Sequence, residues 1–316
     1  MSISLVERMD NGKLPLIFRD ILILSLLFAL PQAGPLLTPS VLYLYSRYGL
    51  FTGKRMALCA VVLAVPLAFW LSSLPTLILS ATFFAAGVVL ARSADRADSP
   101  VLSFGKAALT LAGLWALLLA GTYFMTGQNI YQEQAVSLQM AMREAAQYST
   151  GDAVSPETKA MVVEAVNETT RIILPAALLM PALLVPMTAI MLCNAVEGIR
   201  RLPRRWIDFR LWRLPDFLVW IVIGFALCLG LTDGFVAVVA VNALILLGVV
   251  YAMQGLAMVK FFFDSRHLPM PAQFVLIFLV VSQSLFGLPV LTIVGLVEVW
   301  ADFRRLGRRK PPTQLQ

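Results

Sequence analysis

The side chains that could take part in chemistry are polar residues inside long apolar stretches. A polar group is costly at membrane depth, so it marks either a functional site or a hydrogen bond between helices. Seven residues fit this description: Gln32, Asn194, Glu197, Asn242, Gln254, Gln283 and Glu298. Their amides and carboxylates can bind a small polar ligand, and they can equally bind a neighbouring helix.

Gln283 is the first candidate for contact with a substrate, because it lies beside a break in the apolar sequence at Gly287 and Pro289. Asn242 and Gln254 are the next candidates, and they share one apolar stretch. They are twelve residues apart, which directs them about 120° apart on a helix. One ligand therefore cannot use both from this helix alone, and interhelical hydrogen bonding also explains either residue.

Catalytic motifs and metal-ligand spacings do not occur in the sequence. It has no Walker A, GxSxG or HExxH motif and no pair of carboxylates within an apolar stretch. The single histidine, His267, and the three cysteines, Cys59, Cys193 and Cys228, are too scattered for a zinc site. We therefore expect no catalytic residues, no bound metal and no cofactor, and we predict that the protein is not an enzyme.

The elements that position these residues must be membrane helices. Of 316 residues, 59% are apolar and 14% are charged, against about 45–50% and about 25% in a soluble domain. The mean hydropathy is +0.81. This composition disfavours a soluble enzyme, a disordered chain and a nucleic-acid-binding domain, although the net charge is +7. The predicted partner is the lipid bilayer, and no nucleic acid is expected.

The apolar stretches predict an all-α, polytopic membrane protein with about 8–10 membrane segments. Six stretches approach the roughly 20 residues of a spanning helix: 56–72, 76–91, 107–125, 172–196, 217–231 and 235–258. Two further regions, 21–45 and 274–300, are broken by proline and glycine and are expected to form hairpins near the two ends. We predict one integral membrane domain over residues 1–316.

The basic residues predict the orientation of the chain. If both broken regions cross twice, 22 of the 25 lysines and arginines lie on one side, as the positive-inside rule requires. Both termini are then cytoplasmic, and the expected location is the bacterial inner (plasma) membrane. Residues 126–170 form the outside loop, for which we predict a helical hairpin that serves as a spacer, a lid or a partner-docking surface.

Two other segments suggest contacts with lipid or with a partner. The segment 197–216 carries six arginines with aromatic residues between them, and we expect Arg204, Arg205, Trp206 and Trp212 to lie at a lipid or partner interface. Gly248, Ala252 and Gly255 share one helical face, which predicts close helix packing within the chain. The alternative is docking to another membrane protein or to a second copy of this chain.

Three parts of the C-terminal half resemble the YybS-like family of bacterial inner-membrane proteins. They are Asn242, residues 251–257 (YAMQGLA) and residues 295–304 (GLVEVWADFR). The resemblance implies no catalytic or binding residue. It implies a fold related to the substrate-binding membrane components of energy-coupling-factor vitamin transporters. Those components bind a small nutrient and dock on a transmembrane partner driven by cytoplasmic ATPases.

Two hypotheses about function remain open at this point. The first is a transport-related component that binds or passes a small molecule, because irregular backbone at membrane depth usually lines a site. The second is a non-catalytic scaffold or assembly factor that acts through the 126–170 hairpin and the Arg/Trp-rich 197–216 loop.

Overall fold

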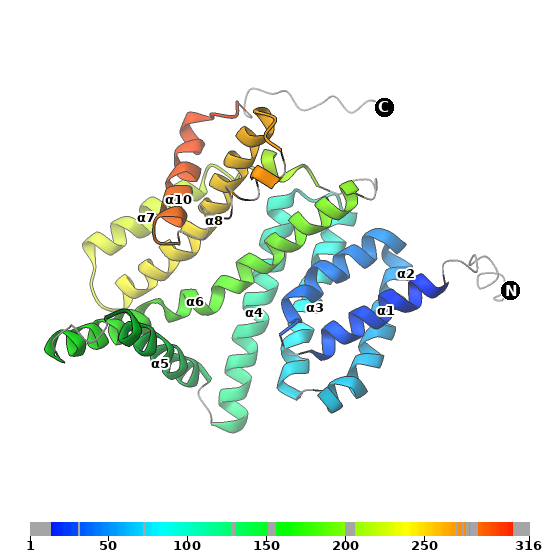
Figure 1. Ribbon diagram of the computed structural model, residues 1–316, viewed down its shortest axis with the longest axis horizontal. Coiled ribbons are helices and arrows are strands. Elements are labelled where there is room, and N and C mark those ends of the chain that lie inside the picture. Colours follow the sequence, from blue (N-terminus) through cyan, green and yellow to red (C-terminus); the bar gives the residue numbers. More distant parts are fainter. Residues whose placement is uncertain are drawn as a thin grey trace. The chain divides into compact units, whose positions relative to one another are not determined.

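The described part of the chain is almost entirely helical (Figure 1). The computed structural model describes residues 14–30, 32–71, 74–127, 130–150, 156–199, 206–269, 271–273, 275, 278 and 284–305. Its helices are α1 (Leu14–Ala29), α2 (Gly34–Leu71), α3 (Leu74–Asp95), α4 (Pro100–Thr126), α5 (Ile130–Thr150), α6 (Pro156–Ile199), the 3-10 turn η1 (Phe209–Leu211), α7 (Leu218–Leu231), α8 (Phe235–Ser265) and α10 (Ser284–Ala301).

Five of the described helices are long and apolar enough to cross a membrane: Gly34–Leu71, Pro75–Asp95, Pro100–Thr126, Glu164–Val196 and Phe235–Ser265. Leu218–Leu231 and Phe286–Ala301 are shorter apolar helices. Many large apolar side chains on these helices, such as Phe69, Leu109 and Trp220, are exposed, as expected for surfaces that contact lipid. This architecture confirms the predicted class of polytopic α-helical membrane protein.

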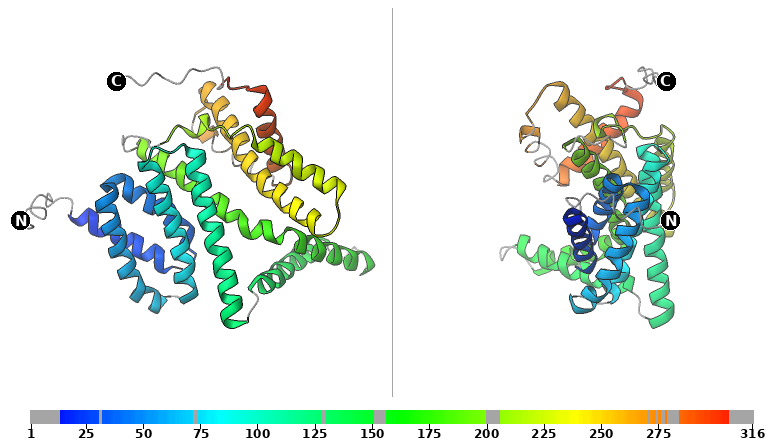
Figure 2. Two further views of the ribbon diagram at one scale, coloured as in Figure 1. Left: turned by 180° about the vertical axis from the view of Figure 1, so that it is seen from behind. Right: turned by 90° about the vertical axis from the view of Figure 1, so that its right-hand side faces the viewer.

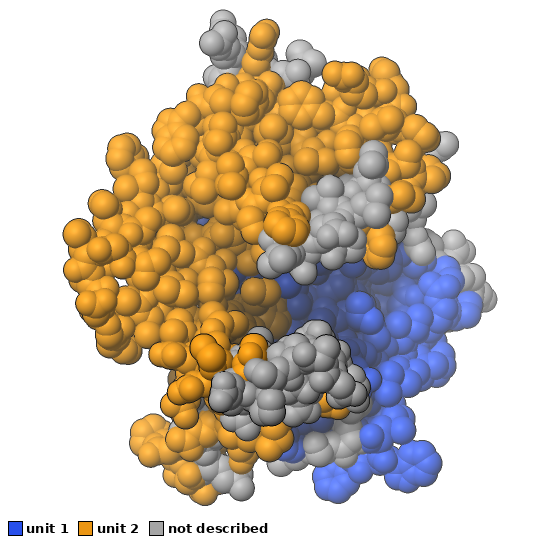
Figure 3. Space-filling model, turned by 60° about the vertical axis from the view of Figure 1, so that its left-hand side comes forward, with its two compact units in different colours: residues 1–116, 182–207 blue, residues 117–181, 208–316 orange. Residues whose placement is uncertain are grey.

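The contacts within the chain define two compact units (Figure 3). Unit 1 contains Met1–Ala116 and Ala182–Ile207, and unit 2 contains Leu117–Pro181 and Asp208–Gln316. The helices α4 and α6 each contribute residues to both units. Each unit is therefore described by itself below.

In unit 1, α1 and the first limb of α2 form a short hairpin. α1 ends at Ala29 and α2 begins at Gly34, so the chain leaves the helix in the region where the proline and glycine residues predict a break. At about 1.5 Å per residue, α1 and residues 34–48 are each about 22–24 Å long. This is less than the roughly 30 Å thickness of the hydrocarbon core, so neither limb reaches straight across it.

Gly49 divides α2 into two limbs that fold back on each other. Its backbone angles are φ 77° and ψ 168°, a conformation that glycine adopts far more readily than other residues. A Cβ atom at Gly53 would lie 3.1 Å from Cα of Tyr45, so the limbs are in close contact just after the kink. The segment predicted at 56–72 is thus the second limb of one kinked helix.

The helices α3 and α4 complete the core of unit 1. The Thr38 hydroxyl donates to the Phe83 carbonyl at 2.9 Å, which links α2 to α3. The indole of Trp115 donates to Thr82 Oγ1 at 2.9 Å, which links α4 to α3. The indole of Trp206 donates to Ser103 Oγ at 3.1 Å, so the segment after α6 is also fastened to α4.

In unit 2, α8 packs against both α7 and α10 (Figure 2). Two glycines allow the backbones of α8 and α10 to meet. A Cβ atom at Gly255 would lie 2.1 Å from the Leu291 carbonyl oxygen, and one at Gly295 would lie 2.0 Å from the Tyr251 carbonyl oxygen. No larger residue fits at either position without separating the helices.

The predicted break near the C-terminus and the predicted helical hairpin at 126–170 have the following helix boundaries. Gly287 and Pro289 lie inside α10, which begins at Ser284, so the helix continues through the expected break; Pro289 is its sixth residue and leaves the Leu285 carbonyl without the usual intrahelical N–H donor. In the 126–170 segment, α5 is a separate helix, while α6 begins at Pro156 and runs without interruption into the membrane stretch. Residues 151–155, where the turn between them was expected, lie outside the described residues.

Candidate functional site

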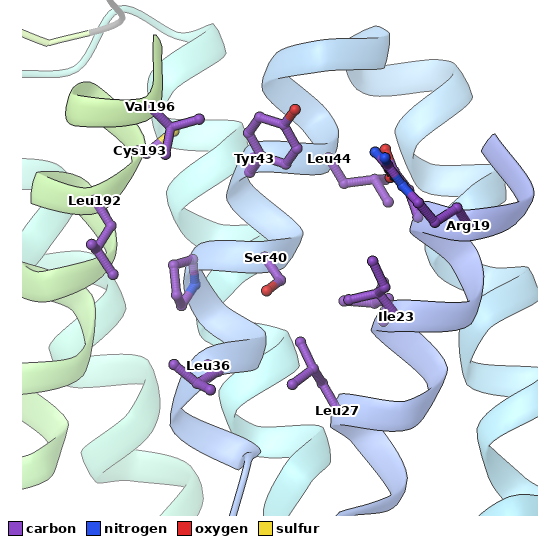
Figure 4. A pocket seen from close by; sticks show the side chains of 13 residues that line it. Arg19, Ile23, Leu27, Leu36, Ser40, Tyr43, Leu44, Leu192, Cys193 and Val196 are labelled. Atoms are coloured by element: carbon purple, nitrogen blue, oxygen red, sulfur yellow. Dashed lines mark hydrogen bonds and ion pairs between the residues drawn. The ribbon is translucent and has the colours of Figure 1, made fainter. Parts of the chain in front are cut away.

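A groove of about 460 Å³ lies in unit 1 between α1, the first limb of α2 and the C-terminal part of α6 (Figure 4). This volume is within the range of about 300–1,000 Å³ that is typical of small-molecule sites. Its apolar lining consists mainly of Ile23, Leu24, Leu27, Leu36, Pro39, Leu44, Leu192 and Val196. The polar lining groups are Arg19, Asp20, Ser40 and Tyr43, with Cys193 on α6.

The lining residues place charge at one end of the groove and apolar groups at the other. Because α1 and the first limb of α2 run in opposite directions, Arg19 near the start of α1 lies at the same end as Tyr43 on α2. Leu27 and Leu36 lie toward the turn that joins the two helices. The groove is therefore amphiphilic along its length, and it extends over about 12 Å from Arg19 to Leu27.

Asp20 organises the charged end. Its Oδ1 accepts hydrogen bonds from Nε of Arg19 at 3.1 Å and from Nη2 of Arg19 at 2.8 Å. Its Oδ2 accepts from Nη1 of Arg47 at 3.2 Å and from the Tyr48 hydroxyl at 3.0 Å. Nη1 of Arg47 also donates to the Tyr43 hydroxyl at 3.1 Å. We call Arg19, Asp20, Tyr43, Arg47 and Tyr48 the rim cluster.

The amide of Asn242 is bound to backbone groups within unit 2. Its Oδ1 accepts from the Ala176 N–H at 2.7 Å, and its Nδ2 donates to the Ile172 carbonyl at 2.6 Å and to the Val238 carbonyl at 2.7 Å. In a regular helix the Ala176 N–H would bind the Ile172 carbonyl. Pro175, which disturbs the helix at this turn, lies between them, so Asn242 supplies partners for both groups from α8.

Gln254 joins three segments of unit 2 in the same manner. Its Oε1 accepts from the Leu214 N–H at 2.9 Å, and its Nε2 donates to the Gly295 carbonyl at 2.9 Å. The amide thus ties α8 to the connector before α7 and to α10. Both polar ends of this buried side chain are used by the chain itself, so we infer a structural role.

Glu298 and Arg304 form a buried ion pair in unit 2. Nε of Arg304 lies 2.8 Å from Oε1 of Glu298, and the two side chains are 0% and 3% exposed. Arg304 also donates to the carbonyls of Arg210 at 2.7 Å and of Trp212 at 3.0 Å. The pair therefore fastens the end of α10 to the connector around η1.

The remaining predicted positions are placed as follows. Trp206 and Trp212 are both buried in the protein rather than exposed on its surface. Gly255 packs on α10, a Cβ atom at Gly248 would lie 3.8 Å from Cγ2 of Thr292, and Ala252 is buried. The structure thus places this stripe against α10 within the chain. Gln283, Arg204 and Arg205 lie outside the described residues.

The sequence did not predict the rim cluster. Its arginines, Arg19 and Arg47, entered the prediction only as two of the 22 basic residues that orient the chain. One signal was available: Asp20 is an acidic residue at the edge of an apolar stretch, next to a basic residue. Its second basic partner, Arg47, is 27 residues away. Only the hairpin brings the two arginines onto one carboxylate.

Within the described residues, no group of three or more His, Cys, Asp or Glu side chains could hold a metal ion. A family model described as Predicted membrane protein (DUF2232) matches residues 21–299. No match is found among curated proteins or among solved structures.

Proposed function

This chain belongs to the DUF2232 family of predicted membrane proteins, and we propose that it is a transport-related component that binds a small amphiphilic molecule in the groove of unit 1. The observation that carries the proposal is the groove itself. It combines a small-molecule volume, an apolar lining and a charged rim at one end. Such a site suits a molecule with an apolar chain and a polar head.

The exposure of the lining favours a ligand that arrives from the bilayer. Ile23 is 47% exposed and Leu36 is 53% exposed, so the groove is open along apolar residues. The short hairpin of α1 and residues 34–48 supports this further, because irregular backbone at membrane depth is typical of sites in transporters.

The distribution of basic residues supports a membrane orientation for this component, and the family resemblance supports a non-enzymatic binding role. The positive-inside rule puts Arg19 and Arg47 on the cytoplasmic side of the bacterial inner membrane, with both termini in the cytoplasm. The similarity to the YybS-like family, and through it to the binding components of energy-coupling-factor transporters, favours ligand binding without catalysis. The proposed role is accordingly non-enzymatic, and it does not use Asn242 or Gln254 as ligand contacts.

A groove-filling variant tests the proposal. The full-length protein in a neutral detergent is titrated with dodecanol and dodecyl phosphate, and bound molecules are counted by native mass spectrometry. Ser40→Phe fills the groove and is expected to abolish saturable binding. Ser137→Phe, on the exposed surface of α5, makes the same substitution elsewhere and is expected to bind normally.

Thermal unfolding of both variants checks that they are folded, and reconstituted vesicles show whether the bound molecule also crosses the bilayer. Equal binding by Ser40→Phe and the unmodified protein, with similar melting temperatures, would contradict the proposal. If the protein binds the amphiphile but does not carry it across the bilayer, it is a binding component and not a permease.

A scaffold is the second candidate, and exposed apolar side chains outside the membrane stretches favour it. Val136 and Met140 lie one turn apart on α5, and Met161 lies on the first part of α6; all three are exposed. Such a surface could bind a membrane partner or a second copy of this chain. Deletion of residues 132–167 would remove a scaffold function and leave amphiphile binding intact, and the opposite result would exclude the scaffold.

A further inference from the structure

We propose that the ligand of the unit 1 groove carries a phosphate headgroup, which the guanidinium of Arg19 binds. This inference rests on the proposed function and names the class of amphiphile. It is argued from the hydrogen bonds of the rim cluster and from its charge. The occupant is a single-chain lipid phosphate rather than free phosphate, because the apolar groove continues from the rim.

The rim cluster has a net positive charge. It holds two guanidiniums and one carboxylate, so one positive charge is left over. Both guanidiniums pair with Asp20, Arg19 at 2.8 Å and Arg47 at 3.2 Å. The Arg19 side chain is 51% exposed and lines the groove, whereas the Arg47 side chain is 20% exposed and does not. Arg19 is therefore the guanidinium of the rim cluster that a ligand in the groove can contact.

Donors remain available at this mouth. The hydrogen bonds to Asp20 use Nε and Nη2 of Arg19, and those of Arg47 use Nη1. Within the described part of the chain, Nη1 of Arg19 is left to donate at the groove, whereas Arg47 does not line it. A phosphate has three strong acceptor oxygens and binds guanidinium groups well.

A cationic headgroup does not fit the same site. Both oxygens of Asp20 already accept hydrogen bonds, two from Arg19, one from Arg47 and one from Tyr48. A cation would have to displace a guanidinium from this carboxylate, and it would meet the positive charge that remains. Asp20 is thus a positioning residue, which binds both guanidiniums despite their mutual repulsion and so holds Arg19 at the groove.

The test compares headgroups on one chain length. The full-length protein in neutral detergent is titrated with dodecyl phosphate, dodecanol and inorganic phosphate. We expect dodecyl phosphate to bind at least about tenfold more tightly than dodecanol, the effect of one charge-assisted contact. We expect inorganic phosphate to compete only weakly, and the preference for dodecyl phosphate to shrink as salt is added.

Variants of the arginines assign the contact. Arg19→Gln is expected to weaken the binding of dodecyl phosphate far more than that of dodecanol and so to remove the preference for the phosphate. Arg19→Lys keeps the charge and is expected to keep part of the preference. Arg55→Gln is the matched control on α2, because Arg55 stacks on the ring of Phe51 at 4.2 Å and does not line the groove.

Each outcome separates this inference from the proposed function. Equal binding of dodecanol and dodecyl phosphate, both blocked by Ser40→Phe, would overturn the phosphate headgroup and keep the groove. An unchanged preference in Arg19→Gln would likewise overturn it. Strong competition by inorganic phosphate would contradict the statement that the occupant is a lipid phosphate rather than free phosphate. Binding of neither amphiphile would overturn the proposed function as well.

Discussion

The buried polar residues of unit 2 and the rim cluster of unit 1 use their hydrogen-bonding groups in different ways. In unit 2, Asn242, Gln254 and Arg304 are buried and bind backbone groups of neighbouring segments. In unit 1, Arg19 and Asp20 line an open groove, and the bonds between them leave guanidinium donors at its rim. The three side chains of unit 2 use their hydrogen-bonding groups within the protein, whereas Arg19 in unit 1 keeps a donor at the groove.

This difference teaches how to weigh a polar residue in an apolar stretch. The cost of burial is the same whether the partner is a ligand or a backbone carbonyl. What distinguishes the two is whether the hydrogen-bonding groups are already used. By that criterion Asn242 and Gln254 are structural, and the rim cluster is the better site for a ligand.

The largest effect is expected when the buried ion pair of unit 2 is broken. Arg304→Met leaves the Glu298 carboxylate buried without its cation, which typically costs about 3–5 kcal/mol. Unfolding in mild detergent, followed by circular dichroism, measures the loss. Arg19→Met removes a guanidinium from the exposed rim of unit 1 and should lower the melting temperature far less.

A double variant sharpens this first prediction. In Glu298→Leu/Arg304→Met no charge stays buried, and much of the lost stability should return. If Arg304→Met and Arg19→Met destabilised the protein equally, the contrast between the buried guanidinium of Arg304 and the exposed guanidinium of Arg19 would be wrong.

A smaller effect is expected from Asn242→Leu. The change leaves the Ala176 N–H and the Ile172 carbonyl without the partner that spans the turn at Pro175. Each buried group left unsatisfied costs about 1–3 kcal/mol. The matched change in unit 1 is Asn194→Leu, because among the described residues the Asn194 side chain makes one long hydrogen bond, 3.4 Å from its Nδ2 to the Ile207 carbonyl.

Thermal unfolding and hydrogen exchange of residues 172–176 measure the result. We expect Asn242→Leu to increase exchange at Ala176 and Asn194→Leu to have little effect on stability. An equal loss of stability in both variants would remove the distinction between the two asparagines.

The smallest effect concerns a surface carboxylate of unit 1. Hydrogen bonds from Lys106 and then Ser93 lower the pKa of Asp98 below its ordinary value of 3.8. The stability that they contribute is therefore complete above pH 3.8, and it is lost as the pH falls from there through the lower pKa of the folded state.

Melting temperatures measured from pH 6 to pH 3 check this prediction. Asp98→Asn should reduce the acid-dependent decrease, and Glu133→Gln, on the exposed surface of α5, should leave it unchanged. An identical decrease in Asp98→Asn and the unmodified protein would show that this cluster does not contribute.

The sequence predicted the helices well because membrane insertion depends mainly on local composition. The apolar stretches at 76–91, 107–125, 172–196, 217–231 and 235–258 correspond to α3, α4, α6, α7 and α8. The prolines and glycine near residues 31–34 correctly indicated a break after α1. Hydropathy counts residues along the chain, and it therefore finds a helix without knowledge of its neighbours.

The partner of each polar group was decided by tertiary structure alone. Asn242 meets Ile172 from 70 residues away, and Arg304 meets Arg210 from 94 residues away. No local pattern encodes such distances along the chain. For the same reason the groove could not be read from the sequence: Arg19 and Arg47 meet on Asp20 only because the hairpin folds back. Composition determined that this chain is a membrane protein. Tertiary packing decided which of its polar groups are used within the protein and which can bind a ligand.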